Sequence, residues 1–339
     1  MILTFLTAVI NDPSIDAIYI PLPNGLHYEW ALRALAKGKH VLLEKPSVNN
    51  AAEAEALFRH PMLNKPGAPV LLEAFHYRFQ PTWKYFLTLV DRPNVERVES
   101  ITKVPSMFFR KDDIRFRYEL GGGTMLDLGS YQMSVLRQVF GAEPEECLEC
   151  VATRCAPPFE LCDAGATGTF RFPGGNIGVF TCSLQSSLTE FTLPRVTVTH
   201  KPVVVVDDKL PAGQEKTRAR KLVIHNYMVS GAWHRIDIED EFTVRKTSAD
   251  EVVRRWKTKE SKKIYDWADA GVPDQPSEPY WLSYRHMLEQ FVNRIRGREG
   301  SGQWVDLEDS VAQAKMIDMA YLKSGLPLRP TSKFTLEEA

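Results

Sequence analysis

The sequence predicts an α/β protein with a parallel sheet in residues 1–94, a mostly antiparallel sheet in residues 95–325 and a tail over residues 326–339. In the first part, short apolar runs alternate with helical patterns, as in strand–helix–strand units. In the second part, segments rich in Val, Thr and Phe follow one another, and helical patterns return near the end. The length of 339 residues also suits about two domains.

The first part has the pattern of three strands and two helices. Residues 17–20 are a continuous apolar run, which is typical of a strand buried on both faces. Asn24 is expected to cap the following helix with its side-chain oxygen, and Gly38 ends that helix. The further expected elements are a strand at 40–43, a helix at 50–59 and a strand at 70–75.

The second part has the pattern of an antiparallel sheet. Its strands are expected at 96–108, 147–154, 166–172, 177–185, 191–199 and 202–207. The turn Pro173-Gly174-Gly175-Asn176 joins two of them as a hairpin. Helical patterns cover 123–140, 280–296 and 308–324, and the polar segment 208–222 is predicted to be a loop.

The composition argues against several classes of partner. With a formal net charge of −1, the chain has no strong attraction for nucleic acid or acidic lipid. The opening MILTFLTAVI is too short to cross a bilayer and lacks the basic flank of a signal peptide. We therefore expect a cytoplasmic protein with no membrane or nucleic-acid partner.

The five cysteines argue against a secreted disulfide framework, because their number is odd and the chain is large. Cys147 and Cys150 have CxxC spacing, but no second pair with zinc-type spacing follows them. The alternation of residue types around them suits a strand instead. We therefore expect no metal site.

The corner Glu44-Lys45-Pro46 directly follows the expected strand at 40–43. Pro46 disfavours the helical conformation for the residue before it, so Lys45 is expected to be extended at the carboxyl end of that strand. Ligands of open parallel sheets bind at such ends. Lys45 could therefore hydrogen-bond a substrate hydroxyl or lower the pKa of a neighbouring group. The alternative is an ordinary surface lysine.

A second candidate lies where three glycines, Gly121 to Gly123, lead into a helical pattern and allow a close approach of backbone. Asp127 and Tyr131 are four residues apart, so they share one helix face and could form an acid/base pair. A cation would help Tyr131 to ionise near neutral pH, and Lys45 would supply it if the two segments meet. The alternative is a solvated helix face.

The chain resembles the glucose–fructose oxidoreductase/inositol dehydrogenase/MocA family of NAD(P)-dependent oxidoreductases over about residues 10–325. The motifs that carry the resemblance are DAIYIPLPNGLHYEWALRALAKGKHVLLEKP, EAFHYRFQP and GGGTMLDLGSYQMSVLRQVFG. Because it has Tyr131 where many members have His, the chain is most similar to dimeric dihydrodiol dehydrogenases and NADP-dependent D-xylose dehydrogenases, fungal ones in particular. The resemblance implies a Rossmann-type parallel sheet followed by a mostly antiparallel sheet with helices on one face.

The resemblance also implies roles for single residues. Lys45 would lie beside the nicotinamide of NADP or NAD, Tyr131 would be the acid/base, and Asp127 would orient the substrate or Tyr131. The residues that would line the cofactor side are Pro21, Asn24, His27, Glu44, Lys45 and Arg78. The Lys45–Pro46 peptide would be cis, and two copies would pair through the antiparallel sheet. Considered apart from the family's motifs, Arg78 and its neighbour Tyr77 would more often belong to a packing cluster at the start of a helix than to a binding site.

The chain departs from the family pattern at its start, where the strand and GxGxxG-type loop that grip the pyrophosphate are missing. Two explanations are open, a truncated form of a working enzyme or a genuinely short protein that binds dinucleotide poorly. In both cases we expect this chain to bind NADP weakly.

The expected function is hydride transfer between NADP and the C1 hydroxyl of an aldose such as D-xylose, forming a lactone, or the hydroxyl of a trans-dihydrodiol. The alternative is a non-catalytic regulator of a sugar pathway, or an inactive fragment. A regulator would not need Lys45, Asp127 and Tyr131 together, and the chain has all three.

Overall fold

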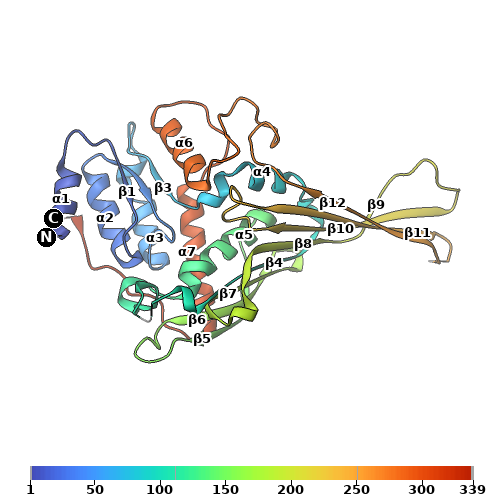
Figure 1. Ribbon diagram of the computed structural model, residues 1–339, viewed down its shortest axis with the longest axis horizontal. Coiled ribbons are helices and arrows are strands. Elements are labelled where there is room, and N and C mark those ends of the chain that lie inside the picture. Colours follow the sequence, from blue (N-terminus) through green and yellow to red (C-terminus); the bar gives the residue numbers. More distant parts are fainter. Residues whose placement is uncertain (1, 111, 250, 337–339) are drawn as a thin grey trace.

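The computed structural model describes residues 2–110, 112–249 and 251–336, and it has the two-sheet architecture that the sequence predicts. Figure 1 shows a small sheet with its helices at one end of the molecule, with the two chain termini beside it. The large sheet begins next to this part and extends to the opposite end. The chain therefore divides into a compact α/β part and an elongated sheet part.

The small sheet is parallel, with the strand order β1-β2-β3. β2 and β3 are short and buried, which suits their continuous apolar sequence, whereas the edge strand β1 exposes Ala17 and Tyr19. The burial on both faces that we expected for residues 17–20 is therefore wrong. The elements of this part are α1 (Ile2–Asn11), β1 (Ala17–Ile20), α2 (Asn24–Ala36), β2 (His40–Leu43), α3 (Ala51–Phe58), β3 (Leu71–Glu73) and α4 (Pro81–Thr88).

The capping prediction for this part is also wrong. Asn24 does not cap α2, because the N-cap residue is Pro23 and no side chain caps this helix. The Asn24 amide instead donates to the carbonyl oxygen of Gly121, at 2.9 Å. Asn24 therefore links the start of α2 to the glycine run of the second part.

The large sheet is mixed, and in the described part of the chain it has nine strands in the order β12-β11-β10-β8-β4-β7-β6-β5, with β9 paired to β10. Its pairs are antiparallel except for β4 and β7, which run parallel. The strands are β4 (Val95–Pro105), β5 (Glu146–Arg154), β6 (Asp163–Phe172), β7 (Asn176–Ser186), β8 (Thr192–His200), β9 (Val203–Val204), β10 (Gln214–His225), β11 (Arg235–Lys246) and β12 (Val252–Lys262). The predicted hairpin turn at Pro173–Gly175 joins β6 to β7.

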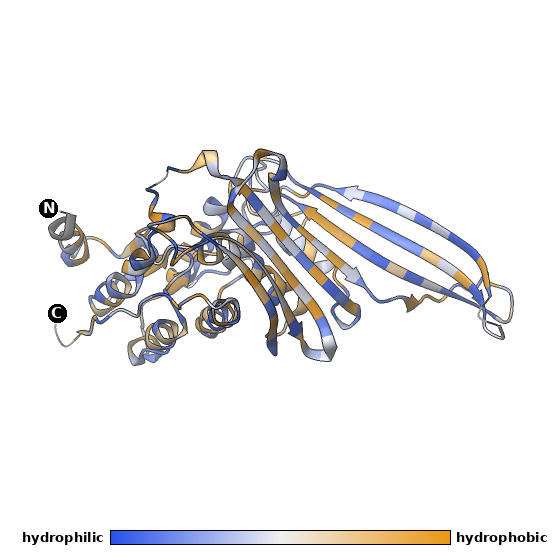
Figure 2. Cartoon of the chain, turned by 90° about the horizontal axis from the view of Figure 1, so that it is seen from below, coloured by the Kyte–Doolittle hydropathy of each residue, from blue (hydrophilic) through white to orange (hydrophobic). Residues whose placement is uncertain are grey.

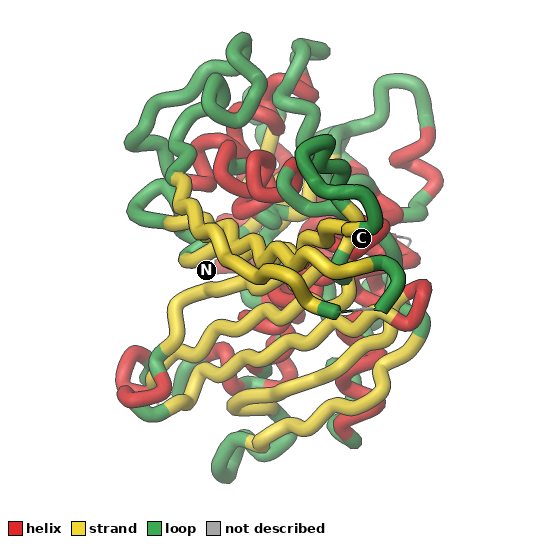
Figure 3. The backbone as a smooth tube through the Cα atoms, turned by 90° about the vertical axis from the view of Figure 1, so that its right-hand side faces the viewer, coloured by secondary structure: helices red, strands yellow, loops and turns green. Residues whose placement is uncertain are grey.

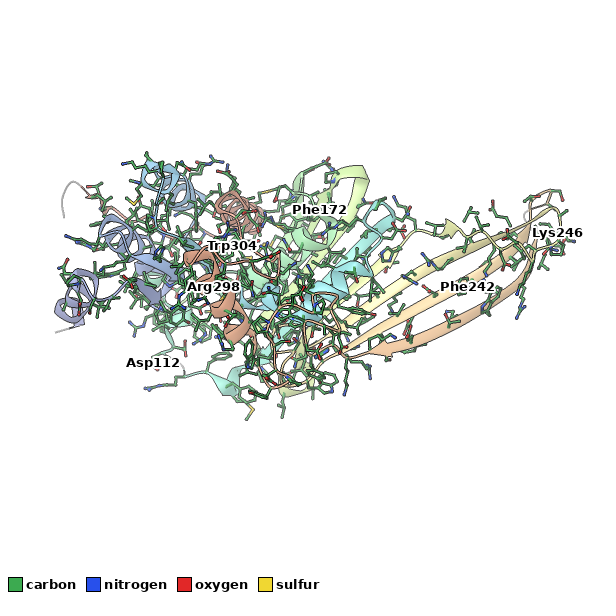
Figure 4. All side chains as sticks on the ribbon, turned by 90° about the horizontal axis from the view of Figure 1, so that it is seen from above. Asp112, Phe172, Phe242, Lys246, Arg298 and Trp304 are labelled. Atoms are coloured by element: carbon green, nitrogen blue, oxygen red, sulfur yellow. The ribbon has the colours of Figure 1, made fainter. Side chains whose placement is uncertain are left out.

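The loop predicted at 208–222 is correct for residues 208–213 and wrong for the rest, because β10 begins at Gln214. β10, β11 and β12 extend beyond the helices as a projecting arm, on which Figure 4 places Phe242 and Lys246. Figure 2 shows hydrophilic and hydrophobic residues alternating along these strands. The arm strands carry charged pairs such as Arg220 with Asp240 at 2.8 Å, and β12 is exposed along most of its length, so a polar sequence does not exclude a strand here.

Helices cover one face of the large sheet, and Figure 3 shows the strands in front with helices behind them. α5 (Ser130–Phe140) packs on β4 and β7, α6 (Ser283–Ile295) packs on the short turn η2 (His76–Phe79), and α7 (Leu307–Ser324) packs on β5 and α3. α7 belongs to both hydrophobic cores, since Val311 lies in the core of the small sheet and Ile317 in that of the large one. That two copies pair through the opposite face stays a prediction.

The segment after α7, predicted as a tail, runs back over both parts. Leu328 accepts a hydrogen bond from the Tyr118 hydroxyl at 2.5 Å, and Pro330 accepts one from the Asn49 amide at 2.8 Å. Residues 326–336 therefore hold the two parts together, whereas residues 337–339 lie outside the described residues.

Three smaller observations complete the fold. The Lys45–Pro46 peptide is cis, as predicted. Cys147 and Cys150 lie in β5, and all five cysteines are buried and unbridged. No helix among residues 2–110, 112–249 and 251–336 is long and apolar enough to cross a membrane.

Candidate active site

A crevice of about 440 Å³ lies between the carboxyl ends of the small sheet and the helical turn after the glycine run. One wall comes from the residues that follow β1 and β2. The other wall comes from η7 (Met125–Gly129), a π-helical turn that continues into α5. The predicted site residues that line the crevice are Pro21, Asn24, Glu44, Lys45, Asp127 and Tyr131.

Lys45 reaches across the crevice to the second wall. Its ammonium Nζ is 2.9 Å from Asp127 Oδ1, 2.7 Å from the Asp127 carbonyl oxygen and 4.4 Å from the centre of the Tyr131 ring. The Lys45 side chain is 9% exposed and that of Asp127 is 24% exposed, so the pair is partly shielded from water. The three residues that the sequence singles out therefore meet in one place.

Asp127 is held as a carboxylate by two cations. Burial works to raise its pKa, but Lys45 and Arg115 outweigh this effect and lower the pKa below its ordinary value. Arg115 Nε lies 3.1 Å from Asp127 Oδ2, and the same guanidinium pairs with Asp113 at 3.0 Å. Asp127 therefore provides a fixed negative charge that aims Lys45 into the crevice.

Tyr131 makes its hydrogen bond to a residue outside the predicted set. Its hydroxyl oxygen is 2.7 Å from His76 Nε2. Burial raises the pKa of Tyr131 well above its ordinary value, and Tyr284 and Glu44 raise it further. The expectation that Lys45 lets Tyr131 ionise near neutral pH is therefore wrong for this chain, because the Lys45 hydrogen bonds go to Asp127. Tyr131 is a neutral phenol here.

The glycine run makes the crevice narrow enough for these contacts. Gly121 and Gly123 have φ of +74° and +128°, which favour glycine. A Cβ on Gly121 would lie 2.3 Å from the side chain of Asn49, and a Cβ on Gly123 would lie 2.1 Å from that of Arg329. The close backbone approach predicted for this run is confirmed.

Arg329 fixes the run from behind. Its Nε donates to the carbonyl oxygen of Gly122 at 2.5 Å, and its NH2 group pairs with Asp163 Oδ1 at 3.0 Å. The Tyr321 hydroxyl donates to the same Asp163 oxygen at 2.9 Å. This cluster is fully buried and sets the direction from which η7 enters the crevice.

Two predicted cofactor residues do not line the crevice. The ring nitrogens of His27, which is fully buried, lie 2.9 Å from the Pro46 carbonyl oxygen and 2.7 Å from that of Leu22. His27 thus stabilises the backbone at Pro46 through this contact and does not face the crevice. Arg78 is buried elsewhere in an ion pair with Asp309 and donates to the carbonyl oxygen of Trp304 at 3.0 Å.

Several residues at or near the crevice were not predicted as site residues, and four of them make polar or aromatic contacts there. The Tyr19 hydroxyl donates to Glu44 Oε1 at 2.6 Å, and Tyr284 stacks on the ring of His76 with centroids 4.4 Å apart. The other two are Arg115 and His76 itself. Tyr19 and His76 lie at strand ends, which is the signal that could have identified them, whereas Tyr284 and Arg115 lie outside any informative pattern.

The crevice fits the nicotinamide end of a dinucleotide. It lies at the carboxyl ends of parallel strands, where such cofactors bind, and combines the apolar Pro21 and Leu22 with the polar Asn24 and Glu44. In the part of the chain that the structure describes, no glycine-rich turn follows a strand of the small sheet. The residues present therefore fit the nicotinamide and not the pyrophosphate.

Two family models match the chain. Residues 4–64 match the model described as an oxidoreductase family with an NAD-binding Rossmann fold, and residues 94–200 match the GFO/IDH/MocA C-terminal domain. The two matches fall on the small sheet and on the first part of the large one.

Curated relatives match over part of their length. D-xylose 1-dehydrogenase (NADP(+)) 2 of Haloferax volcanii is 38% identical over 172 residues, which cover 47% of this chain and 50% of that protein. Trans-1,2-dihydrobenzene-1,2-diol dehydrogenase of Xenopus tropicalis is 32% identical over 136 residues, or 40% of each chain. The chain thus spans about half of the length of the curated relatives it matches.

Solved structures share the fold. An aldose–aldose oxidoreductase from Caulobacter crescentus, complexed with glycerol, has a TM-score of 0.66 at 18% identity and covers 95% of this chain and 80% of that one. A 3-ketoreductase from Actinomadura kijaniata, in complex with NADP and TDP-benzene, has a TM-score of 0.65 at 20% identity over 94% and 81%. With the family models on both parts, the motifs and this shared architecture, the chain belongs to the GFO/IDH/MocA family of oxidoreductases.

Proposed function

We propose that this chain is an NADP-dependent dehydrogenase that oxidises the C1 hydroxyl of an aldopyranose such as D-xylose to the lactone, or the hydroxyl of a trans-dihydrodiol. The observation that carries the proposal is the meeting of Lys45, from the end of β2, with Asp127 of η7 and Tyr131 of α5. Asp127 is 82 positions after Lys45 in the sequence, and Tyr131 is farther still. Packing alone does not require a lysine, a carboxylate and a phenol in one crevice.

The residues have separate roles in this proposal. Pro21, Asn24 and Glu44 would hold the nicotinamide, which supplies a hydride acceptor or donor when bound. Tyr131 would exchange a proton with the substrate oxygen, and Lys45 would stabilise negative charge on that oxygen. Asp127 would keep the Lys45 ammonium in place through the contacts described above.

The lining of the crevice supports a small polyhydroxylated substrate. The carboxylates of Glu44 and Asp127 are groups that accept hydrogen bonds from hydroxyls. Ile114, Leu120 and Met228 make an apolar side that suits the face of a sugar ring or of a cyclic diol. Two relatives, a D-xylose dehydrogenase and a dihydrodiol dehydrogenase, agree with both choices.

The Tyr131→Phe variant tests this proposal. Because the variant keeps the ring and loses the exchangeable proton, we expect turnover of D-xylose with millimolar NADP, followed at 340 nm, to fall by about 10²- to 10⁴-fold. Tyr77→Phe is a matched control, since the Tyr77 hydroxyl is buried outside the crevice against Ser134 at 2.9 Å. Unaltered turnover in Tyr131→Phe would show that the role given to Tyr131 is wrong. Parallel assays with NAD and with a trans-dihydrodiol would identify the preferred pair.

A further inference from the structure

His76 lies directly behind Tyr131 and is not part of the crevice wall. It follows β3, is 5% exposed, and places Nε2 at 2.7 Å from the Tyr131 hydroxyl oxygen. Its other face is covered by the ring of Tyr284, at an interplanar angle of 24°. Among the described residues, His76 is the one hydrogen-bond partner of the Tyr131 hydroxyl, because the Lys45 ammonium is bonded to Asp127.

The surroundings of His76 favour one tautomer. Burial and the nearby Lys45 lower its pKa to about 3, so the ring is neutral and carries a single N–H. His76 Nδ1 is buried, and no residue in the described ranges accepts or donates a hydrogen bond to it. A buried N–H with no acceptor is rarer and costlier than a bare nitrogen lone pair. The proton therefore belongs on Nε2, where Tyr131 accepts it.

We propose that His76 is a positioning residue for proton transfer at Tyr131, because its Nε2–H donates to the Tyr131 oxygen and leaves the Tyr131 hydroxyl hydrogen free for the substrate. This inference rests on the role proposed above for Tyr131. In the reducing direction the Tyr131 O–H bond breaks and an O–H bond forms on the substrate oxygen. His76 keeps its own proton and stabilises the phenolate that results. In the oxidising direction the O–H bond of the substrate breaks and the O–H bond of Tyr131 forms.

The tautomer can be measured without cofactor or substrate. In the 339-residue chain labelled with ¹⁵N-histidine, we expect the His76 signals, assigned by their loss in His76→Phe, to show a protonated Nε2 and a bare Nδ1. The Nε2 shift should change in Tyr131→Phe. A proton on Nδ1 would overturn the proposal, because Tyr131 would then donate to His76 and have no proton free for the crevice.

Kinetics supply the second test. His76→Phe keeps a ring against Tyr284 but has no donor, so we expect kcat to fall by about ten- to a hundredfold with KM little changed. In the oxidation of D-xylose, Tyr131 must be ionised to accept the proton, so the acidic limb of the kcat profile should move to higher pH, because the phenolate loses a donor. His76→Gln, whose amide can donate, should recover part of the loss.

His286→Phe is the matched control. His286 is also buried with an unpartnered Nδ1, but it packs against Trp267 and Trp281 and makes no recorded contact with Tyr131. Equal losses in His76→Phe and His286→Phe, or no loss in His76→Phe, would overturn the proposal. A wild-type chain without turnover would contradict the proposed function, and the ¹⁵N measurement would still decide the hydrogen bond.

Discussion

Three buried carboxylates are paired with cations, whereas three others, around the loop that follows Pro46, accept hydrogen bonds from backbone N–H groups. The pairs are Asp127 with Lys45 and Arg115, Asp163 with Arg329, and Asp309 with Arg78 and Arg137. The cations lower the pKa of Asp127 and of Asp309, although burial alone would raise both.

The three carboxylates of the second group, Glu73, Glu53 and Asp318, hold the chain that follows Pro46. They accept from Ser47 N (Glu73, 3.0 Å), Asn49 N (Glu53, 2.9 Å) and Ala51 N (Asp318, 2.9 Å). In the described part of the chain none of the three forms an ion pair. Burial raises the pKa of Glu53 and Glu73, and it raises that of Asp318 to about 6.

The difference shows how one type of side chain serves two purposes. A cation keeps a carboxylate charged at any physiological pH, which suits Asp127, whose charge aims Lys45. Backbone N–H groups can also fix the position of a carboxylate, but they do not prevent it from taking up a proton. The catalytic side is therefore electrostatically fixed, and the supporting loop responds to pH.

The largest expected effect comes from removing the cation of a fully buried pair. Arg329 and Asp163 are both 0% exposed, so Arg329→Met leaves an uncompensated buried charge and should lower the free energy of unfolding by about 3–5 kcal/mol. Arg115→Met is the matched control, since the Arg115 side chain is 43% exposed and its loss should cost no more than about 1 kcal/mol. Urea unfolding measures both, and equal losses would contradict the difference drawn between the two pairs.

A smaller effect on stability, with a large one on turnover, is expected for Lys45→Met. Asp127 keeps Arg115 and some contact with water, so the free energy of unfolding should fall by only about 1 kcal/mol. Turnover should fall by about 10²- to 10³-fold, because the charge that faces the substrate oxygen is lost. Urea unfolding and the 340 nm assay separate the two quantities. A stability loss as large as that of Arg329→Met would show that Lys45 is a structural residue.

The last prediction concerns the loop that follows Pro46, and its effect on stability depends on pH. The pKa of Asp318 in the folded chain, about 6, lies above the ordinary 3.8, so the folded protein binds this proton more tightly than the unfolded chain. The contribution of Asp318 to stability should therefore increase as pH falls from 7 towards 4. Asp318→Asn has no charge to bury and should be more stable than wild type at pH 7 by about 1–2 kcal/mol. The gain should vanish near pH 4.

Thermal unfolding across this pH range measures the Asp318 effect. The exposed Asp112, labelled in Figure 4, offers a control through Asp112→Asn. A gain for Asp318→Asn that is the same at pH 4 and pH 7 would show that proton uptake at Asp318 is not its cause.

Most of the small sheet and its corner could be predicted, because their signals are local. The apolar run at 17–20 forms a strand as predicted, although this strand is not buried on both faces. The Lys45–Pro46 peptide is cis, as the family resemblance implied. The arm strands β11 and β12 escaped prediction because charged residues run through both of them and neither contains a continuous apolar run. The motifs indicated Lys45, Asp127 and Tyr131 but gave no signal for Arg115 or Tyr284.

The sequence by itself determined which chemical groups stand at strand ends and helix starts, since proline, glycine and residue periodicity act over a few positions. Only the tertiary structure decided which partner each group takes. Lys45 bonds Asp127 instead of the Tyr131 hydroxyl, and Tyr131 is left to His76, 55 positions earlier in the chain. The physical reason is that hydrogen bonds and ion pairs depend on distances of a few ångströms, and those distances are set by the packing of η7 and α5 against the small sheet.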